Sequence, residues 1–513
     1  MGEVKEGRRP LRLRALLLIA CCAACVVGGL VVWVVWAPRA APPRDDQTRQ
    51  HAISEVAVVE PTTPVPVESE PTDERESITC FRGNPERNLS GVGAVPRHPK
   101  LLWRFETKTK LEGPYEQRGD PSLGPGFPWR GTGWTGQPCI VDGRVYVGST
   151  DSHVYCLDLE SGREIWHYGL RHSIKGSISV LDGAIFHGGR DNRVRRYTLG
   201  GEMVWETRIG QDTDSNPVIV EGKLFIGGED NAVYAFDPND GSVLWRFGPT
   251  AGSCESSPCC AEGLIMIGSS GGALYALDAD TGERRWEYWT GGDGDPTPVY
   301  HEGRVYHAAE MGGSLERGKV HCLTVATGEP LWVRDLPRGV WATVALNPAL
   351  GCCYVGCNDG VLYCLAMGTG DILWQRRLTG ARIWSSPVVA DGTILVGVRD
   401  GTLWCLDERI GLPLWVFDEG FDIDSTPAVA DGRIVIGSQN GWIYCIGEDE
   451  ERGPLNPHWF RRGPGFDERT DTDPAGVATI RSSAPEPRAH PDTHASTGEG
   501  YLQPVYGPGY GHD

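Results

Sequence analysis

Eight tryptophans recur along the chain at a nearly constant interval, and this spacing constrains the fold more than any other feature. From the second tryptophan onward the steps are 39 to 46 residues long, which is the length of one four-stranded blade of a β-propeller. The tryptophans therefore mark equivalent positions in successive blades. They are Trp103, Trp166, Trp205, Trp245, Trp286, Trp332, Trp374 and Trp415.

Each repeat consists of short apolar segments separated by turn residues. In the repeat that ends at Trp245, the first predicted strand follows Pro217 and stops at Glu221-Gly222. An Asp-Gly or Glu-Gly pair occupies the same place in six further repeats. Two-residue hairpin turns require positive φ, which glycine adopts at little cost. The pattern therefore predicts an antiparallel hairpin at the start of each blade.

The number of repeats predicts how the ring closes. Seven complete units end at the tryptophans from Trp166 to Trp415, and an eighth runs from Ser425 to Ile446 without a fourth strand. Residues 101–105, which contain Trp103, supply the missing strand. Such closure removes the open sheet edges that promote aggregation. We predict an all-β fold, an eight-bladed β-propeller whose N-terminal strand closes the last blade.

The N-terminal residues carry a membrane signal. Basic side chains are frequent in residues 1–14, and an apolar run follows at 15–37, long enough to cross a bilayer. The positive-inside rule makes the first segment cytoplasmic and places the rest of the chain outside. A second hypothesis is a lipoprotein anchored at Cys21, because Leu18-Ile19-Ala20-Cys21 resembles a bacterial lipobox.

Composition predicts the parts of the chain on either side of the propeller, which we place at residues 79–447. Residues 38–78 are rich in Pro and Glu and are expected to form a disordered spacer. Residues 448–513 show no strand periodicity and are expected to form a disordered tail. The net charge of −20 argues against a nucleic-acid partner.

Cysteines recur in the third strand of several repeats. Five of them occupy the position where other repeats have Ala235 or Ala276, which predicts a small buried side chain and neither a metal site nor a disulfide. These are Cys156, Cys322, Cys364, Cys405 and Cys445. The pairs Cys259-Cys260 and Cys352-Cys353 align with ordinary strand positions.

The residue at or just before the start of each first strand is expected to face the central channel. Such side chains form a ring that could bind a cation or a planar ligand; the alternative is a solvated polar channel. Crowded carboxylates in this ring should have raised pKa values unless a cation neutralises them. The ring contains Trp134, Lys175, Asp214, Glu255, Asp295, Trp341, Trp384 and Asp424.

Two insertions are predicted to lie at the same mouth of the channel. The long loop over residues 108–135 contains Trp129 and Trp134, and a second insertion covers residues 310–319. Loops beyond the minimum length are often functional. They are interpreted either as a lid over an aromatic pocket or as a plug in the channel.

The segment from Ala276 to Trp286, which contains Asp278, Thr281 and Gly282, resembles the tryptophan-docking motif of the PQQ-type eight-bladed propellers. The resemblance covers residues 101–447. It implies that each tryptophan packs between blades as part of the scaffold. The family includes quinoprotein dehydrogenases, whose cofactor and calcium ligands come from the inner loops, and non-enzymatic outer-membrane assembly lipoproteins.

These observations favour a non-enzymatic scaffold, because the large insertions of the dehydrogenases are missing and no P-loop, nucleophile elbow or zinc-protease motif is present. A monomeric propeller that binds an unidentified protein partner, without a cofactor, is the first hypothesis. The second is a PQQ- and calcium-dependent dehydrogenase using Asp214, Glu255, Asp295 and Asp424, with Trp341 or Trp384 stacked on the quinone. The third is a sensor of an extracellular ligand.

Overall fold

Antiparallel four-stranded sheets make up almost all of the structure, a computed structural model that describes residues 76–89, 91–108, 136–311, 317–450 and 460–462. All of these residues belong to one unit of the chain. The predicted span at 15–37 and the loop at 109–135 lie outside the described residues. Within the described residues, no helix has the length and apolar character needed to cross a membrane.

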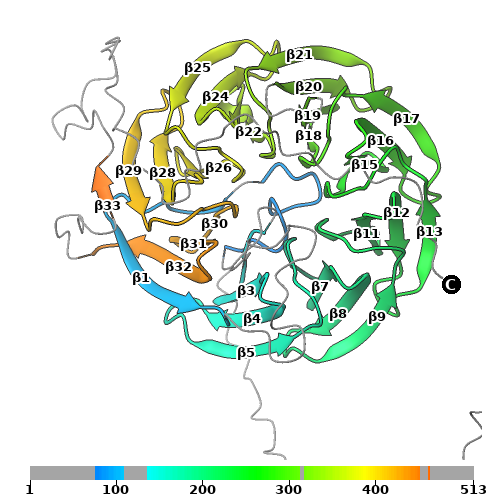
Figure 1. Cartoon of the computed structure of the whole chain (residues 1–513), viewed down its shortest axis with the longest axis horizontal. Coiled ribbons are helices and arrows are strands. Elements are labelled where there is room, and N and C mark those ends of the chain that lie inside the picture. The colour runs from blue at the N-terminus through cyan, green and yellow to red at the C-terminus, as the bar shows by residue number, and fades with distance from the viewer. Residues whose placement is uncertain (1–75, 90, 109–135, 312–316, 451–459, 463–513) are drawn as a thin grey trace, which may run out of the picture. The chain divides into compact units, whose positions relative to one another are not determined.

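Eight sheets are arranged around a central axis, and each forms one blade (Figure 1). The predicted eight-bladed propeller is confirmed. Blades 1 and 2 consist of β2 (Cys139–Val141), β3 (Arg144–Gly148), β4 (His153–Asp158), β5 (Glu164–Gly169), β6 (Ser179–Leu181), β7 (Ala184–Gly189), β8 (Arg193–Thr198) and β9 (Met203–Arg208). Blades 3 and 4 consist of β10 (Val218–Val220), β11 (Lys223–Gly228), β12 (Ala232–Phe236), β13 (Val243–Phe247), β14 (Cys259–Ala261), β15 (Leu264–Gly268), β16 (Ala273–Asp278) and β17 (Arg284–Trp289).

The second half of the ring repeats the arrangement. Blades 5 and 6 consist of β18 (Val299–His301), β19 (Arg304–Glu310), β20 (Gly318–Thr324), β21 (Pro330–Leu336), β22 (Ala345–Asn347), the 3-10 helix η2 (Pro348–Leu350), β23 (Cys352–Gly356), β24 (Val361–Ala366) and β25 (Ile372–Arg377). Blades 7 and 8 consist of β26 (Val388–Ala390), β27 (Thr393–Gly397), β28 (Thr402–Asp407), β29 (Pro413–Asp418), β33 (Phe460–Arg462), β30 (Ala428–Ala430), β31 (Arg433–Gly437), β32 (Trp442–Glu448) and β1 (Pro99–Glu106).

Blade 8 closes the ring as predicted. Strand β1 pairs antiparallel with β32, and Trp103 lies opposite Cys445. Blade 7 contains a feature that the sequence does not predict. Strand β33, which belongs to the segment expected to be a tail, pairs with β29 as a fifth strand.

The five third-strand cysteines are buried, as their alignment with alanines predicts.

The tryptophan ladder joins neighbouring blades. The Trp245 indole N–H donates to the carbonyl of Ala279 in the next blade at 3.1 Å, and the ring lies against Gly282, whose φ is +73°. Equivalent indole bonds run from Trp103, Trp166, Trp205, Trp286 and Trp332, while Trp374 lies against Gly411 of the next blade. The eighth, Trp415, donates to the carbonyl of Pro96 just before β1 of blade 8. The eight tryptophans are therefore scaffold, and each links its own blade to a neighbour.

A closed ring of hydrogen bonds links the blades around the channel. The second residue before each first strand donates its backbone N–H to the corresponding segment of the following blade. Seven of the bonds end on a side-chain oxygen, and the eighth runs from Thr426 to the carbonyl of Gly136 at 3.0 Å. The members are Gln137, Ser177, Asn216, Ser257, Thr297, Thr343, Ser386 and Thr426.

The channel is crossed by residues 78–89, 91 and 92, which we call the plug and which lie at the centre of Figure 1. Backbone hydrogen bonds of the plug reach the first strands of five blades, between Ile78 and Ile140, Thr79 and Val180, Pro85 and Cys260, Glu86 and Tyr300, and Val92 and Val429. Because first strands are innermost, the plug fills the channel beside them.

Two buried arginines extend the plug to the three remaining blades. The Arg82 guanidinium donates to the carbonyls of Pro387 at 2.6 Å and Val344 at 3.0 Å. Arg87 donates to Pro258 at 2.8 Å and to Asn216 at 3.1 Å. Both side chains are fully buried, and burial lowers the pKa of Arg82 to about 9. The plug thus contacts all eight blades.

Candidate functional site

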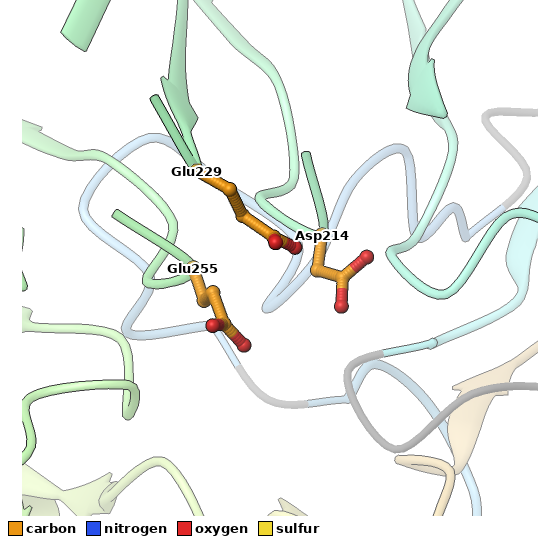
Figure 2. Close-up of side chains that lie close together, drawn as sticks. All are labelled: Asp214, Glu229 and Glu255. Atoms are coloured by element: carbon orange, nitrogen blue, oxygen red, sulfur yellow. The ribbon is translucent and has the colours of Figure 1, made fainter. Parts of the chain in front are cut away.

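Carboxylates gather at the channel mouth on blades 3 and 4. Asp214 and Glu255 precede the first strands of these blades, and Glu229 follows β11. One carboxylate oxygen from each residue lies within 4.8 Å of the other two. Figure 2 shows the three side chains converging from separate loops. The predicted positions Asp214 and Glu255 therefore do meet at one place.

Two basic side chains partly balance this cluster. Lys175 Nζ lies 3.3 Å from an Asp214 oxygen, and an Arg190 nitrogen lies 3.7 Å from the same atom. Burial and the nearby Asp214 raise the pKa of Glu229 to about 9. Burial and the nearby Asp295 raise the pKa of Glu255 to about 8. The cluster therefore holds protons at neutral pH, which is the effect that crowded carboxylates should show.

A second acidic group lies beside the first, on blade 5. The backbone of Asp293 pairs with that of Glu310, with N–O distances of 2.6 and 3.0 Å. Burial and the repulsion of Asp293 raise the pKa of Asp295 well above its usual range. Burial also raises the pKa of Asp293 and of Glu310 to about 7. The insertion that begins at Glu310 thus starts at the channel mouth, as predicted, although its residues 312–316 lie outside the described part.

Aromatic and basic side chains occupy the opposite arc of the mouth. Trp341 and Trp384 stack with centroids 4.2 Å apart and planes inclined by 23°. The Arg399 guanidinium lies 3.8 Å from the Trp384 centroid. Arg399 also pairs with Asp424 at 3.2 Å and with Asp422 at 2.8 Å. Burial raises the pKa of Asp424 to about 7 in spite of this arginine.

Alignment of the repeats with one another identifies one ring of residues at the channel mouth. The structure shows a second ring of charged residues beside it. Lys175, Asp214, Glu255 and Asp295 interact with one another electrostatically, whereas Asp424 belongs to the arginine–tryptophan arc. Trp129 and Trp134 lie outside the described residues. Functional candidates that the alignment missed end or follow the second strand, or precede the first ring by two positions. They are Arg190, Glu229, Glu310, Arg399, Asp212, Asp293 and Asp422.

A signal for this second ring exists in the sequence. The motif Asp-x-Asp occurs before the first strand in three repeats, at 212–214, 293–295 and 422–424. The residue two positions after the glycine near the end of the second strand is charged in three repeats, as Arg190, Glu229 and Arg399. A single position per repeat therefore identifies fewer than half of the charged groups described at the mouth.

Comparison with known proteins places this propeller in a family. The family model described as "Outer membrane protein assembly factor BamB" matches residues 90–208, 198–315 and 316–447. The chain belongs to this family. A curated BamB from Nitrosomonas eutropha is 23% identical over 110 residues, which make up 21% of this chain and 27% of that relative. This match therefore spans about a quarter of the relative's length.

Solved structures show the same fold. BamB from Moraxella catarrhalis gives a TM-score of 0.54 at 17% identity, covering 68% of this chain and 99% of that structure. A europium-containing methanol dehydrogenase gives 0.58 at 16% identity, covering 73% and 98%. The quinohemoprotein alcohol dehydrogenase from Comamonas testosteroni gives 0.57 at 14% identity, covering 73% and 81%. The fold is thus shared between an assembly factor and dehydrogenases.

The acids expected to bind calcium beside a quinone do not gather at one place. Trp384 contacts both the Trp341 ring and the Arg399 guanidinium. Asp424 is paired with Arg399 and does not join the cluster of Asp214 and Glu255. The four acids of the dehydrogenase hypothesis therefore do not form one ligand set.

Proposed function

We propose that this chain is a membrane-anchored, extracytoplasmic scaffold that binds a protein partner at the channel mouth. The family membership of residues 90–447 carries this proposal, because the relatives named in the comparisons include outer membrane protein assembly factors. The apolar run at 15–37 supports the anchor. In this arrangement the propeller presents its mouth to the partner, and no chemical step takes place on the chain.

Two structural observations support docking at the mouth. The plug closes the channel beside the first strands, so a ligand or partner reaches the buried acids from the opposite side. Phe421, in the loop between β29 and β30, keeps 56% of its surface exposed at this mouth. An exposed aromatic side chain beside charged groups is typical of a residue that anchors a protein interface.

The docking surface is tested by site-specific photocrosslinking in the host cell. A photoreactive amino acid replaces Phe421 or Gln211 at the mouth, with Asn239 and Asp280 in turns of the opposite side as matched controls. The proposal predicts one discrete adduct from the mouth positions that the control positions do not give. Equal adducts from both sides, or none from the mouth, would contradict it.

The alternative dehydrogenase function is tested on the purified full chain. The protein is titrated with PQQ and Ca²⁺, and dye-coupled oxidation of a primary alcohol is followed. The scaffold proposal predicts no stoichiometric quinone binding and no turnover. Turnover that depends on added quinone would replace the scaffold with an enzyme, and loss of that turnover in Glu255→Gln would assign the site.

A labelling experiment tests the anchor and its orientation. Single cysteines introduced in residues 1–14 and at Asp280 are treated in intact cells with a reagent that does not cross the inner membrane. The proposal predicts labelling at Asp280→Cys and protection in the first segment. Release of the protein from membranes by salt alone would exclude an integral anchor.

A further inference from the structure

Blade 2 carries a cluster of arginines at the mouth, in a chain whose net charge is −20. Strands β8 and β9 form the outer pair of this blade (Figure 1), and Arg193 begins β8 while Arg208 ends β9. Arg171 belongs to the loop after β5, whose Ser173 carbonyl accepts from the backbone N–H of Arg190 at 3.2 Å. This bond holds the loop against blade 2. We call Arg171, Arg193 and Arg208 the basic rim.

Two members of the basic rim repel each other. Arg193 and Arg208 lie directly opposite each other across β8 and β9, and like charges at such positions destabilise a sheet. The corresponding position of blade 5 holds Lys319 opposite Asp335, which have opposite charges. The blade fold therefore does not require an arginine pair at this position. An anion bound beside both guanidinium groups would offset the repulsion.

Nearby acids balance only part of the positive charge. Glu206 pairs with Arg193 at 3.2 Å and with Arg195 at 3.3 Å, and Asp191 pairs with Arg195. Four arginines, counting Arg195 with the basic rim, thus face two carboxylates and leave an excess of two positive charges. The other two members of the basic rim have no ion-pair partner among the described residues.

The basic rim can be reached from solvent. Arg171 and Arg208 are exposed, and the Arg193 side chain keeps 30% of its surface exposed. An exposed guanidinium offers a fork of donors that matches the two oxygens of a carboxylate. At 0.1 M salt, charges more than about 10 Å away are largely screened. A ligand on the rim therefore responds to the local positive charge more than to the net charge of the chain.

The small extent of the positive charge selects the kind of anion. A bilayer or a nucleic acid would extend past the basic rim over a chain with a net charge of −20, which repels a long polyanion. A short segment with two or three carboxylates matches the excess of two positive charges. A protein partner that docks at the mouth can supply such a segment next to blade 2.

We propose that the basic rim binds a short acidic segment of a protein partner, whose carboxylates accept hydrogen bonds from Arg171, Arg193 and Arg208. This proposal rests on the proposed function, because it names the charge of the segment that the partner brings to blade 2. Binding offsets the repulsion between the two opposed arginines, which the free chain retains.

Titration of the purified full chain in detergent with hexaglutamate, at 0.1 M salt, tests the recognition. Saturation-transfer NMR on the peptide follows the binding, and hexaglutamine is the neutral control that should not bind. Arg171→Gln and Arg208→Gln should each weaken hexaglutamate about two- to fivefold, because an exposed ion pair contributes up to about 1 kcal/mol. The double variant should lose about four- to twenty-five-fold if the two charges act independently.

Matched variants separate recognition from a structural role. Arg163→Gln and Arg409→Gln, at exposed arginines in turns of the opposite side, should bind hexaglutamate as the wild type does. Arg208→Lys keeps the charge and should bind more tightly than Arg208→Gln. Because Arg208→Gln removes one of two opposed charges, its urea midpoint should equal or exceed that of the wild type while binding falls.

Several results would overturn the proposal: equal binding of hexaglutamate and hexaglutamine, unchanged binding in the double variant, or an equal loss in Arg163→Gln. A lower urea midpoint in Arg208→Gln, without recovery of binding in Arg208→Lys, would also overturn it. Mixed micelles that contain phosphatidylglycerol test the other class of anion. Binding of these micelles that exceeds the binding of hexaglutamate and is lost in Arg208→Gln would assign the rim to a lipid surface instead.

Photocrosslinking from Gln211 in the host cell distinguishes failure of this proposal from failure of the scaffold function. If the double variant gives the adduct at the wild-type yield, the scaffold stands and the assignment of the basic rim is wrong. If hexaglutamate binds at the rim but no mouth position gives an adduct, the rim stands as a site for carboxylates and the scaffold function fails.

Discussion

The indole N–H of Trp415 donates to the carbonyl of Pro96 at 2.9 Å, although 319 residues separate the two along the chain. In the other blades the corresponding carbonyl belongs to the turn before the fourth strand of the next blade. Blade 8 has no such turn, because β1 enters from the N-terminal side. The segment before β1 therefore replaces the missing turn as the acceptor.

Trp415→Phe tests the contribution of this substitute acceptor. The ring remains but the donor is lost, so the free energy of unfolding should fall by about 1–2 kcal/mol. Trp415→Ala also removes buried ring surface and should cost about 3–5 kcal/mol. Urea unfolding of the purified chain measures both. Trp245→Phe, which removes an ordinary bond of the ladder, is the control and should match Trp415→Phe; a much smaller loss at Trp415 would show that Pro96 is a weak acceptor.

Arg82→Met should destabilise the propeller although no carboxylate of the described residues pairs with Arg82. The substitution leaves the carbonyls of Pro387 and Val344 without donors in a buried place, and each orphaned group costs about 1–3 kcal/mol. Arg97→Met is the comparison, because Arg97 is exposed and makes a surface ion pair with Asp391, worth about 0–1 kcal/mol. Equal thermal unfolding midpoints for the two variants would exclude a structural role for the plug.

A pair of glycines separates packing of the ladder from backbone strain. Gly282 and Gly263 have φ of +73° and +72°, but a Cβ at Gly282 would lie 2.7 Å from the Trp245 ring, while a Cβ at Gly263 would meet nothing within 4 Å. In both alanine variants, backbone strain should lower the free energy of unfolding by about 1–2 kcal/mol. Only Gly282→Ala should lose more, through displacement of the indole. Chemical unfolding of the two variants gives the difference directly, and a difference near zero would mean that the tryptophan shifts without cost.

The stability of the propeller should fall with rising pH between about pH 4 and pH 9. The folded pKa values of Glu255 and Glu229 are about 8 and 9, above the value of about 4.3 for a free Glu. Between these limits the folded chain binds more protons than the unfolded chain, so the free energy of unfolding falls as pH rises. We expect lower urea midpoints at pH 9 than at pH 6.

Glu255→Gln should reduce this slope and raise the free energy of unfolding at pH 9 by about 1–3 kcal/mol. Glu302→Gln, at an exposed hairpin turn, should leave the slope unchanged. A wild-type chain that is more stable at pH 9 than at pH 6 would contradict the raised pKa values, and so would a slope that Glu255→Gln leaves intact.

The fold was predictable because local patterns and global closure agree. The spacing of Trp166 to Trp415 sets the blade length, and the turn pairs set the hairpins; residues such as Asp142 and Glu221 do have positive φ. The strand at 101–105 belongs to no complete repeat, so the incomplete eighth repeat was its expected partner. The fifth strand β33 was not predictable, since a three-residue pairing after a Pro- and Gly-rich segment leaves no periodic signal.

The candidate site was predictable in part. Alignment places Asp214, Glu255 and Asp295 at the mouth because their offset from the first strand is the same in each repeat. It does not find the plug, since the plug lies outside the repeat and its route across the channel is set by long-range hydrogen bonds. Nor does it separate Asp424 from the other acids, because the pairing with Arg399 depends on which side chain follows β27 in that one blade.

The plug also has a consequence for the order of events during biosynthesis. Residues 78–92 leave the ribosome before any blade, yet the backbone N–H of Val92 has its acceptor only after Val429 has been made. The end of the plug is therefore among the last parts of the domain to be buried. A chain exported while it is being translated therefore stays an open ring until its last blade is made, and a truncation that removes β30 would leave the N–H of Val92 without its acceptor.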